Sequence, residues 1–243
     1  MPPLVADIFH SLKELCFPAV CLICRTGLPA FTEIHLCPDC LKKITLIQPP
    51  LCLCCGVEFT AYGDNHLCGA CLTKPPHFSR ARAIFRYDDA SSTLIHGFKY
   101  GGRTVGGQSF RALSIYAKTM TDLDTPELIV PVPLHPRRLK ERGFNQALVL
   151  AHILFPDQKK AIFADLLTRT RWTEPQVALS GHERRQNLGG AFSIKQANLI
   201  DGRRILLVDD VLTTGTTLNE CAKMLKIHGA IQVEAVTLAR VGY

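Results

Sequence analysis

The sequence predicts an α/β fold, a mostly parallel sheet with helices on both faces, plus a small cysteine-rich module at the N-terminus. Two observations lead to this prediction. From about Arg80 onward, short apolar runs alternate with stretches of helical periodicity, which is typical of repeated strand-helix units. Before that point, ten of the eleven cysteines lie between Cys16 and Cys71. We therefore expect two parts, residues 1–76 and residues 80–243, divided near Lys74-Pro75-Pro76. The first part is expected to begin with a short amphipathic helix, because apolar residues recur there at helical spacing (Leu4, Val5, Ile8, Leu12 and Leu15).

The cysteines of the first part form four CxxC pairs in two groups, and within each group twelve residues separate the two pairs. A CxxC turn supplies one edge of a tetrahedral metal site, and a second pair supplies the opposite edge. The pattern predicts a double zinc ribbon with two structural Zn²⁺ sites, whose ligands are Cys21, Cys24, Cys37, Cys40, Cys52, Cys55, Cys68 and Cys71. An interleaved pairing would use the same ligands. We interpret Cys54 as a bystander.

Disulfides and redox chemistry are the alternatives for these cysteines. Disulfides persist in oxidising compartments, and the N-terminus lacks the basic start, apolar stretch and cleavage site of a signal peptide. No apolar run approaches the roughly 18 residues that a membrane-spanning helix requires. A redox motif needs one CxxC pair rather than four. We therefore expect a cytoplasmic protein without membrane insertion, in which the cysteines bind metal.

Charge is concentrated in the second part. Residues 1–80 carry six basic and six acidic side chains, so the formal net charge of +7 arises entirely after residue 80. A basic surplus of this kind indicates an anionic ligand, either a phosphorylated metabolite or a nucleic acid. A solvated basic surface is the alternative.

The second part predicts four strands and four helices. The strands are expected at Ala83–Tyr87, Leu128–Leu134, Arg204–Val211 and Gln232–Leu238. One helix is expected to be capped by Ser91 and to end at Phe98, and the others are expected at Ser109–Met120, Phe144–Phe155 and Leu218–His228. Gly229 is expected to end the last helix in a left-handed conformation. Ligands of parallel sheets bind at the carboxyl ends of the strands. The segments after Leu134 and Val208 are therefore the expected binding regions.

One of these segments has the composition of a sugar-phosphate site. Residues 205–217 read ILLVDDVLTTGTT, so an acidic doublet and a hydroxyl-rich loop follow a buried strand. Backbone N–H groups and hydroxyls at a helix N-terminus bind phosphate, whereas adjacent carboxylates suit a ribose diol or hydrated Mg²⁺. The lysine of a P-loop is missing. Threonines that only cap the next helix are the alternative.

This stretch resembles the 5-phosphoribosyl-1-pyrophosphate (PRPP) motif of type I phosphoribosyltransferases, and the chain resembles the ComF family, which includes the GntX proteins. The resemblance extends over nearly the whole chain. It includes the paired CxxC module and the segments LIHGFKYGGR (94–103), VPVPLHPRRLKERGFNQ (130–146) and QVALSGHERRQNLGGAF (176–192). It implies a type I phosphoribosyltransferase-like fold for the second part.

The resemblance also implies residue roles. Asp209 and Asp210 would hold the ribose hydroxyls and the associated Mg²⁺, and they are the candidate catalytic residues. The 5′-phosphate would bind to Thr213, Thr214, Gly215, Thr216 and Thr217. A basic loop would bind pyrophosphate through Arg137, Arg138, Lys140 and Arg142, with a plain solvated loop as the alternative. The polar segment 170–187, with Arg184 and Arg185, would be a flexible loop that closes over PRPP, or a surface linker. Lys99, Tyr100 and Arg103 form a further cluster with an acceptor-side or DNA role.

Three functional hypotheses follow. The first is a Mg²⁺-dependent phosphoribosyltransferase with an unknown acceptor. Thr213 stands where 6-oxopurine phosphoribosyltransferases carry an aspartate, so we do not expect hypoxanthine or guanine salvage. The second is a non-catalytic competence factor that binds single-stranded DNA through basic loops and through Phe144, Trp172 and Phe192. The third is a PRPP-sensing regulator. The resemblance favours a PRPP-binding protein linked to DNA uptake or utilisation, or to nucleotide metabolism, with DNA-uptake proteins as partners.

Overall fold

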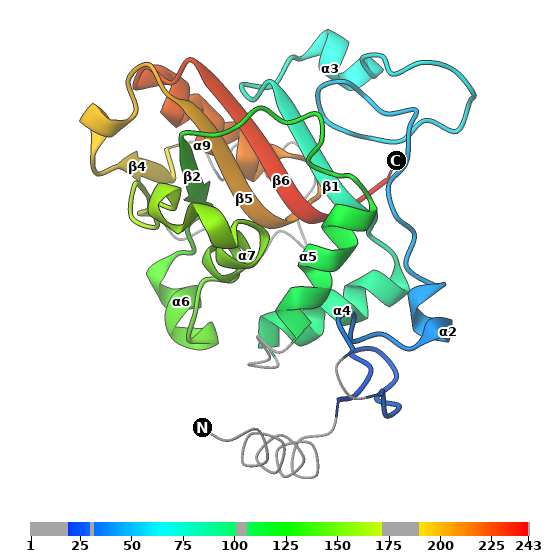
Figure 1. Cartoon of the computed structure of the whole chain (residues 1–243). Helices are drawn as coiled ribbons and strands as arrows, with labels where there is room; N and C mark the ends of the chain where they lie inside the picture. The colour runs from blue at the N-terminus through cyan, green and yellow to red at the C-terminus, as the bar shows by residue number, and fades with distance from the viewer. Residues whose placement is uncertain (1–18, 30–31, 101–105, 172–189, 243) are drawn as a thin grey trace.

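The computed structural model describes residues 19–29, 32–100, 106–171 and 190–242. Its centre is a four-stranded, entirely parallel sheet in the order β1-β6-β5-β2 (Figure 1). The strands are β1 (Arg80–Arg86), β2 (Leu128–Pro131), β5 (Arg204–Leu212) and β6 (Gln232–Arg240). All four predicted strands are present, with bounds that differ by up to three residues from the expected ones.

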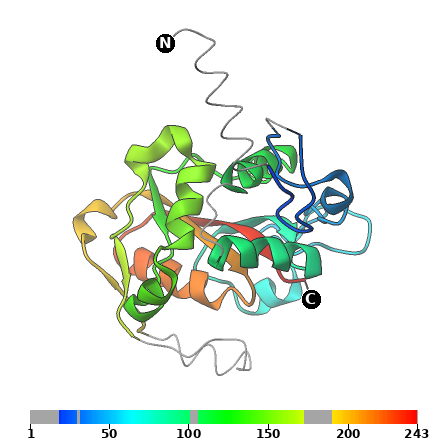
Figure 2. The ribbon, with the colours of Figure 1, turned by 90° about the horizontal axis from the view of Figure 1, so that it is seen from below.

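Helices cover both faces of the sheet, as predicted. Alternate residues of β5 point to opposite faces, so Leu206 packs with the helices of one face and Leu207 with those of the other. The first face carries α4 (Asp89–Tyr100), α5 (Gly107–Tyr116) and α7 (Gln146–Leu154), and the second carries α9 (Thr216–Ile227). Figure 2 shows α9 and α7 on opposite sides of the strands.

Capping residues explain where some of these helices begin and end. The Ser91 N–H donates to Asp88 Oδ1 at 2.9 Å, and the Asp88 N–H donates to Ser91 Oγ at 2.8 Å, so Asp88 caps α4 and Ser91 lies inside it. The expected cap, Ser91, is therefore wrong, because the helix is capped three residues earlier. Gly229 follows α9 with a φ of +93°, the left-handed conformation that the sequence predicted.

Shorter elements complete the described chain. They are α2 (Pro38–Leu41), α3 (Gly69–Thr73), α6 (Pro136–Arg142), η2 (Pro156–Ala161), η4 (Ala197–Leu199) and an antiparallel pair, β3 (Leu167–Arg169) with β4 (Phe192–Ile194). None of the helices in the described ranges has the length and apolar character that crossing a bilayer requires.

The cysteine-rich part packs along the β1 side of the sheet (Figure 1). Between its two groups of cysteines, the chain pairs with the outer edge of β1. The Ile47 N–H donates to the Ile84 carbonyl at 3.1 Å, and the Arg86 N–H donates to the Thr45 carbonyl at 2.8 Å. This pairing satisfies backbone groups that an exposed edge strand would present to other chains.

Candidate functional site

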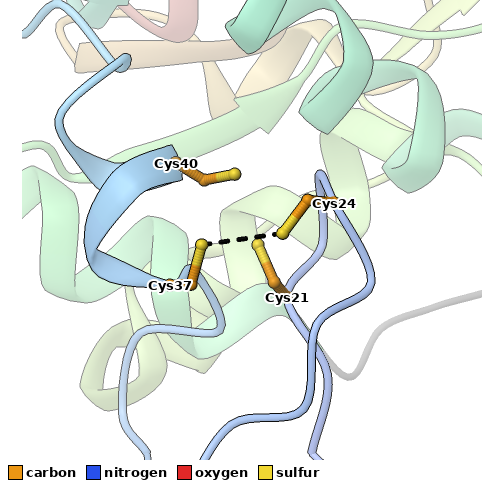
Figure 3. Close-up of side chains that lie close together, drawn as sticks. All are labelled: Cys21, Cys24, Cys37 and Cys40. Atoms are coloured by element: carbon orange, nitrogen blue, oxygen red, sulfur yellow. Dashed lines mark hydrogen bonds between the residues drawn. The ribbon is translucent and has the colours of Figure 1, made fainter.

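The cysteine pairs form two compact sulfur clusters. One contains Cys21, Cys24, Cys37 and Cys40, the other Cys52, Cys55, Cys68 and Cys71, and within each cluster all sulfur atoms lie within 4.8 Å of one another. Figure 3 shows the four side chains of the first cluster pointing toward a common centre, from one loop and from the start of α2. Consecutive pairs therefore come together, and the interleaved pairing does not occur. Cys54 lies outside both clusters, and its Sγ donates to the Phe78 carbonyl at 3.6 Å.

The spacing of the sulfur atoms suits zinc. A tetrahedral site with Zn–S bonds of about 2.3 Å places its sulfurs about 3.8 Å apart, and the Sγ–Sγ distances are 3.6 Å for Cys24 and Cys37 and 3.7 Å for Cys55 and Cys68. Burial alone would raise the pKa of the Cys52 thiol, but backbone N–H groups of Cys68 and Cys55 lower it to about 6. The clusters support two structural zinc sites, and each site uses all four positions for sulfur.

The main cavity of the described residues, about 1110 Å³ in volume, opens at the carboxyl ends of the strands. This is the edge at which ligands of parallel α/β sheets bind. Its walls come from the end of β5, the start of α9, helices α4 and α6, and the start of α7. The sequence-predicted phosphate loop, acidic doublet and basic segment therefore face one space.

The acidic doublet lies near the end of β5 with a lysine beside it. The Asp210 N–H donates to Asp209 Oδ1 at 2.9 Å, and Lys99 Nζ of α4 lies 2.8 Å from Asp210 Oδ2. Burial and the neighbouring charge of Asp210 raise the pKa of Asp209 to about 7, although Lys99 and Arg169 act in the opposite direction. Asp209 therefore binds a proton more readily than an exposed aspartate does.

The loop after β5 turns directly into α9. Gly215 is the N-cap of α9 and has a φ of +74°, a left-handed conformation that disfavours other residues. Thr213, Gly215, Thr216 and Thr217 line the cavity. Thr214 does not, and its hydroxyl lies 2.8 Å from that of Thr216. The first turn of α9 thus presents hydroxyls and backbone N–H groups to the cavity, an arrangement suited to an anion.

The basic segment after β2 is a helix, so the expected loop is wrong in conformation. His135 caps α6 by accepting a hydrogen bond from the Arg137 N–H, and Gly143 ends the helix with a φ of +80°. A proline at the first helical position explains why a helix begins here. Arg137, Arg138 and Arg142 line the cavity, whereas Lys140 is not part of its wall. Three of the four predicted cations therefore face the acidic doublet's cavity.

The sequence missed Arg169 and the role of Lys99. Arg169 ends β3, lines the cavity and lies with its guanidinium 5.7 Å from the centre of the Phe192 ring on β4. Arg169 belongs to no recognisable sequence motif. The only signal in the sequence was its position immediately before the polar segment 170–187. Lys99 was expected in a loose basic-aromatic cluster, and its pairing with Asp210 was not foreseen. The expected N-terminal helix, and also Arg103, Trp172, Arg184 and Arg185, lie outside the described residues.

Two family models match segments of this chain. A double zinc ribbon domain model matches residues 12–72, and a phosphoribosyl transferase domain model matches residues 147–242. A solved structure of glutamine PRPP amidotransferase from B. subtilis is 19% identical, with a TM-score of 0.33, and covers 58% of this chain and 30% of that chain.

Curated relatives extend over most of the chain. The protein named DNA utilization protein YhgH from Salmonella typhimurium is 34% identical over 230 residues, which cover 93% of this chain and 99% of the relative. The protein named competence protein F from Haemophilus influenzae is 37% identical over 171 residues, 68% of this chain and 74% of the relative. With both domain models matched in the order of its two parts, this chain belongs to the ComF family.

Proposed function

We propose that this protein binds PRPP in the cavity at the carboxyl end of β5, and that this binding serves DNA uptake or utilisation. One observation carries the proposal. The acidic doublet, the hydroxyl-rich turn of α9 and the arginines of α6 line the same cavity. A ligand with a diol, a phosphate and a diphosphate matches these three groups at once.

Each part of PRPP has a complementary partner in this arrangement. The loop before α9 and the first turn of α9 would hold the 5′-phosphate through backbone N–H groups and the hydroxyls of Thr213, Thr216 and Thr217. Asp209 and Asp210 would accept hydrogen bonds from the ribose hydroxyls. Arg137, Arg138 and Arg142 would bind the diphosphate, where negative charge accumulates if pyrophosphate departs.

The donor set also fits Mg²⁺, because Asp209 and Asp210 offer the carboxylate oxygens that this hard cation prefers. A bound Mg²⁺ would neutralise part of the diphosphate charge. The protein's own contribution is to position the sugar between the carboxylates and the phosphate turn, and to place arginines beside the leaving group. The acceptor of any phosphoribosyl transfer is left open by this proposal.

Calorimetric titration with PRPP and Mg²⁺ tests the binding. We expect a one-to-one complex that the double substitution Asp209→Asn/Asp210→Asn abolishes. Asp165→Asn, an exposed aspartate away from the cavity, is the matched control and should bind like the wild type. Ribose 5-phosphate lacks the diphosphate and should bind more weakly than PRPP, and Arg138→Gln should reduce that difference. Equal binding of PRPP by the double variant and the wild type would refute the proposed site.

The names of the relatives favour a role with DNA. Two measurements separate a transferase from a non-catalytic binder. If PRPP is consumed and pyrophosphate is released only when an acceptor is present, the protein is a transferase. If single-stranded DNA binds with a steep salt dependence while PRPP remains intact, it is a binder whose contacts are mainly to phosphates.

A further inference from the structure

An ion pair joins helix α4 to the acidic doublet. Lys99 Nζ lies 2.8 Å from Asp210 Oδ2, and the two side chains are 22% and 16% exposed. Because both side chains are largely buried, water screens their charges less than it does at the surface, and the electrostatic attraction between them is stronger. The proposed function uses both carboxylates and gives Lys99 no task.

The backbone of Lys99 is fixed, whereas its side chain has freedom to move. Leu94, Ile95 and Phe98 of α4 are buried, and the Phe98 ring meets the Phe110 ring edge-on at 5.2 Å. This packing holds α4 against α5. The ammonium of Lys99 ends a flexible four-carbon chain, so it can leave Asp210 without any movement of the helix.

A buried amide connects Lys99 to the basic helix. Gln146, only 2% exposed, donates from Nε2 to the Lys99 carbonyl at 3.4 Å, and its Oε1 accepts from Arg142 Nη1 at 3.0 Å. Breaking one side of such a link leaves a buried polar group unsatisfied, which is costly. The link thus runs from the Arg142 side chain to the backbone of Lys99, the residue that neutralises Asp210.

We propose that Lys99 is the resident counter-ion of the acidic doublet. Its ammonium neutralises the Asp210 carboxylate, which would otherwise attract a divalent cation, so the ligand-free site would bind free Mg²⁺ poorly. A sugar diphosphate supplies new negative charge, draws the ammonium away from Asp210 and so admits the cation together with the ligand. Gln146 acts as a positioning residue, because it holds the Arg142 side chain and the Lys99 backbone in place relative to each other. This inference rests on the proposed function and adds a mechanism for ordered, joint binding of cation and ligand.

Mn²⁺ alone, with no PRPP present, is the probe that tests the proposal. Free Mn²⁺ is quantified by its electron paramagnetic resonance signal. Lys99→Met should bind Mn²⁺ about tenfold more tightly than the wild type or better, because a positive charge next to the carboxylate has been removed. Lys99→Arg keeps the charge and should bind Mn²⁺ as weakly as the wild type. Lys223→Met removes an exposed charge of α9 and controls for net charge.

The same variants are then titrated with metal-free pyrophosphate, whose affinity should fall in Lys99→Met. Opposite changes for the two probes distinguish a counter-ion from a merely structural residue, whose loss would weaken both. Gln146→Leu should give a Mn²⁺ affinity between those of the wild type and Lys99→Met.

Unchanged Mn²⁺ affinity in folded Lys99→Met overturns the proposal; if that variant does not fold, Lys99→Gln gives the same comparison. A wild-type protein that fails to bind PRPP would instead refute the proposed function, since the Mn²⁺ comparison uses no PRPP.

Discussion

The two zinc ribbons share one spacing but belong to different faces of the sheet. The first ribbon packs with α4, α5 and α7, and its Cys24 is exposed. The second packs with α9, and all four of its cysteines are buried. Arg240 at the end of β6 even donates from Nη2 to Cys55 Sγ at 3.3 Å. The two ribbons therefore have the same cysteine spacing, but the cysteines of the second ribbon are more deeply buried than those of the first.

The second ribbon also reaches the phosphate turn. Just after it, the His77 N–H donates to Asn219 Oδ1 in the second turn of α9 at 2.7 Å. The Phe78 ring approaches to 3.9 Å the point where a Cβ on Gly215 would lie. The first ribbon has an analogous tie, from the His35 N–H to Ser109 Oγ at 2.9 Å, but that tie ends on α5. We infer that the second ribbon supports phosphate binding and the first supports the α4–α5 face.

Substitution of one zinc-binding cysteine in each ribbon should give the largest difference in PRPP affinity. Cys55→Ser should lose one zinc and most of the affinity for PRPP, by about tenfold or more, because folding of the ribbon depends on its metal. Cys24→Ser should lose one zinc and some thermal stability while PRPP affinity stays near the wild-type value. Zinc content, melting temperature and calorimetric titration measure these outcomes. Equal losses of PRPP affinity in both variants would contradict the division of roles.

The pH dependence of stability tests whether the acidic doublet, at the end of the strand between the two faces, has an unusual pKa. The pKa of Asp209, raised to about 7 from an ordinary 3.8, means that the unfolded chain releases this proton first. The contribution of Asp209 to the stability of the ligand-free protein should therefore fall between about pH 4 and pH 7, and its full penalty is present above pH 7. Asp209→Asn removes this contribution, so the variant should become more stable than the wild type as pH rises.

At pH 8 the unfolding free energy of Asp209→Asn should exceed that of the wild type by about 2 kcal/mol. This is about half of the value that the full pKa shift implies at about 1.4 kcal/mol per pKa unit. Urea unfolding of both proteins at pH 5, 6, 7 and 8 measures the difference, in which the pH dependence of zinc binding cancels. A stability difference that stays constant over this range would show that Asp209 titrates like an exposed carboxylate.

The hydrogen bonds from the His77 and His35 N–H groups allow the most closely matched comparison, with the smallest expected effects. Asn219→Ala removes the acceptor of the His77 N–H, and Ser109→Ala removes the acceptor of the His35 N–H. Each should cost about 1 kcal/mol of unfolding free energy. Only Asn219→Ala should also weaken PRPP binding, by about fivefold. If Ser109→Ala weakens binding as much as Asn219→Ala, the phosphate turn depends on both ribbons equally.

Local patterns were sufficient to predict much of this molecule. The four strands followed from short apolar runs bounded by polar turns, and the double zinc ribbon from the CxxC spacing, because both signals are contained in neighbouring residues. The parallel α/β fold with helices on both faces is confirmed. The division at residues 76–80 stays a prediction, since residues of both ribbons share core clusters with the sheet.

What the sequence did not reveal depends on contacts between distant segments. Lys99 and Asp210 are 111 positions apart, and only the packing of α4 brings them together. Lys140 belongs to the predicted cationic set, but helical geometry turns it away from the side on which Arg138 and Arg142 lie. The pair β3–β4 was missed because three-residue strands carry little periodicity.

The central claim is that one cavity holds a sugar through its diol and through its phosphate at the same time. Titration of the Asp209→Asn/Asp210→Asn protein and the wild type with PRPP and Mg²⁺ tests it most directly. The account predicts a saturable complex for the wild type and none for the double variant, with both proteins folded and carrying two zinc ions. Undiminished binding by the variant, or no binding by the wild type, would contradict it.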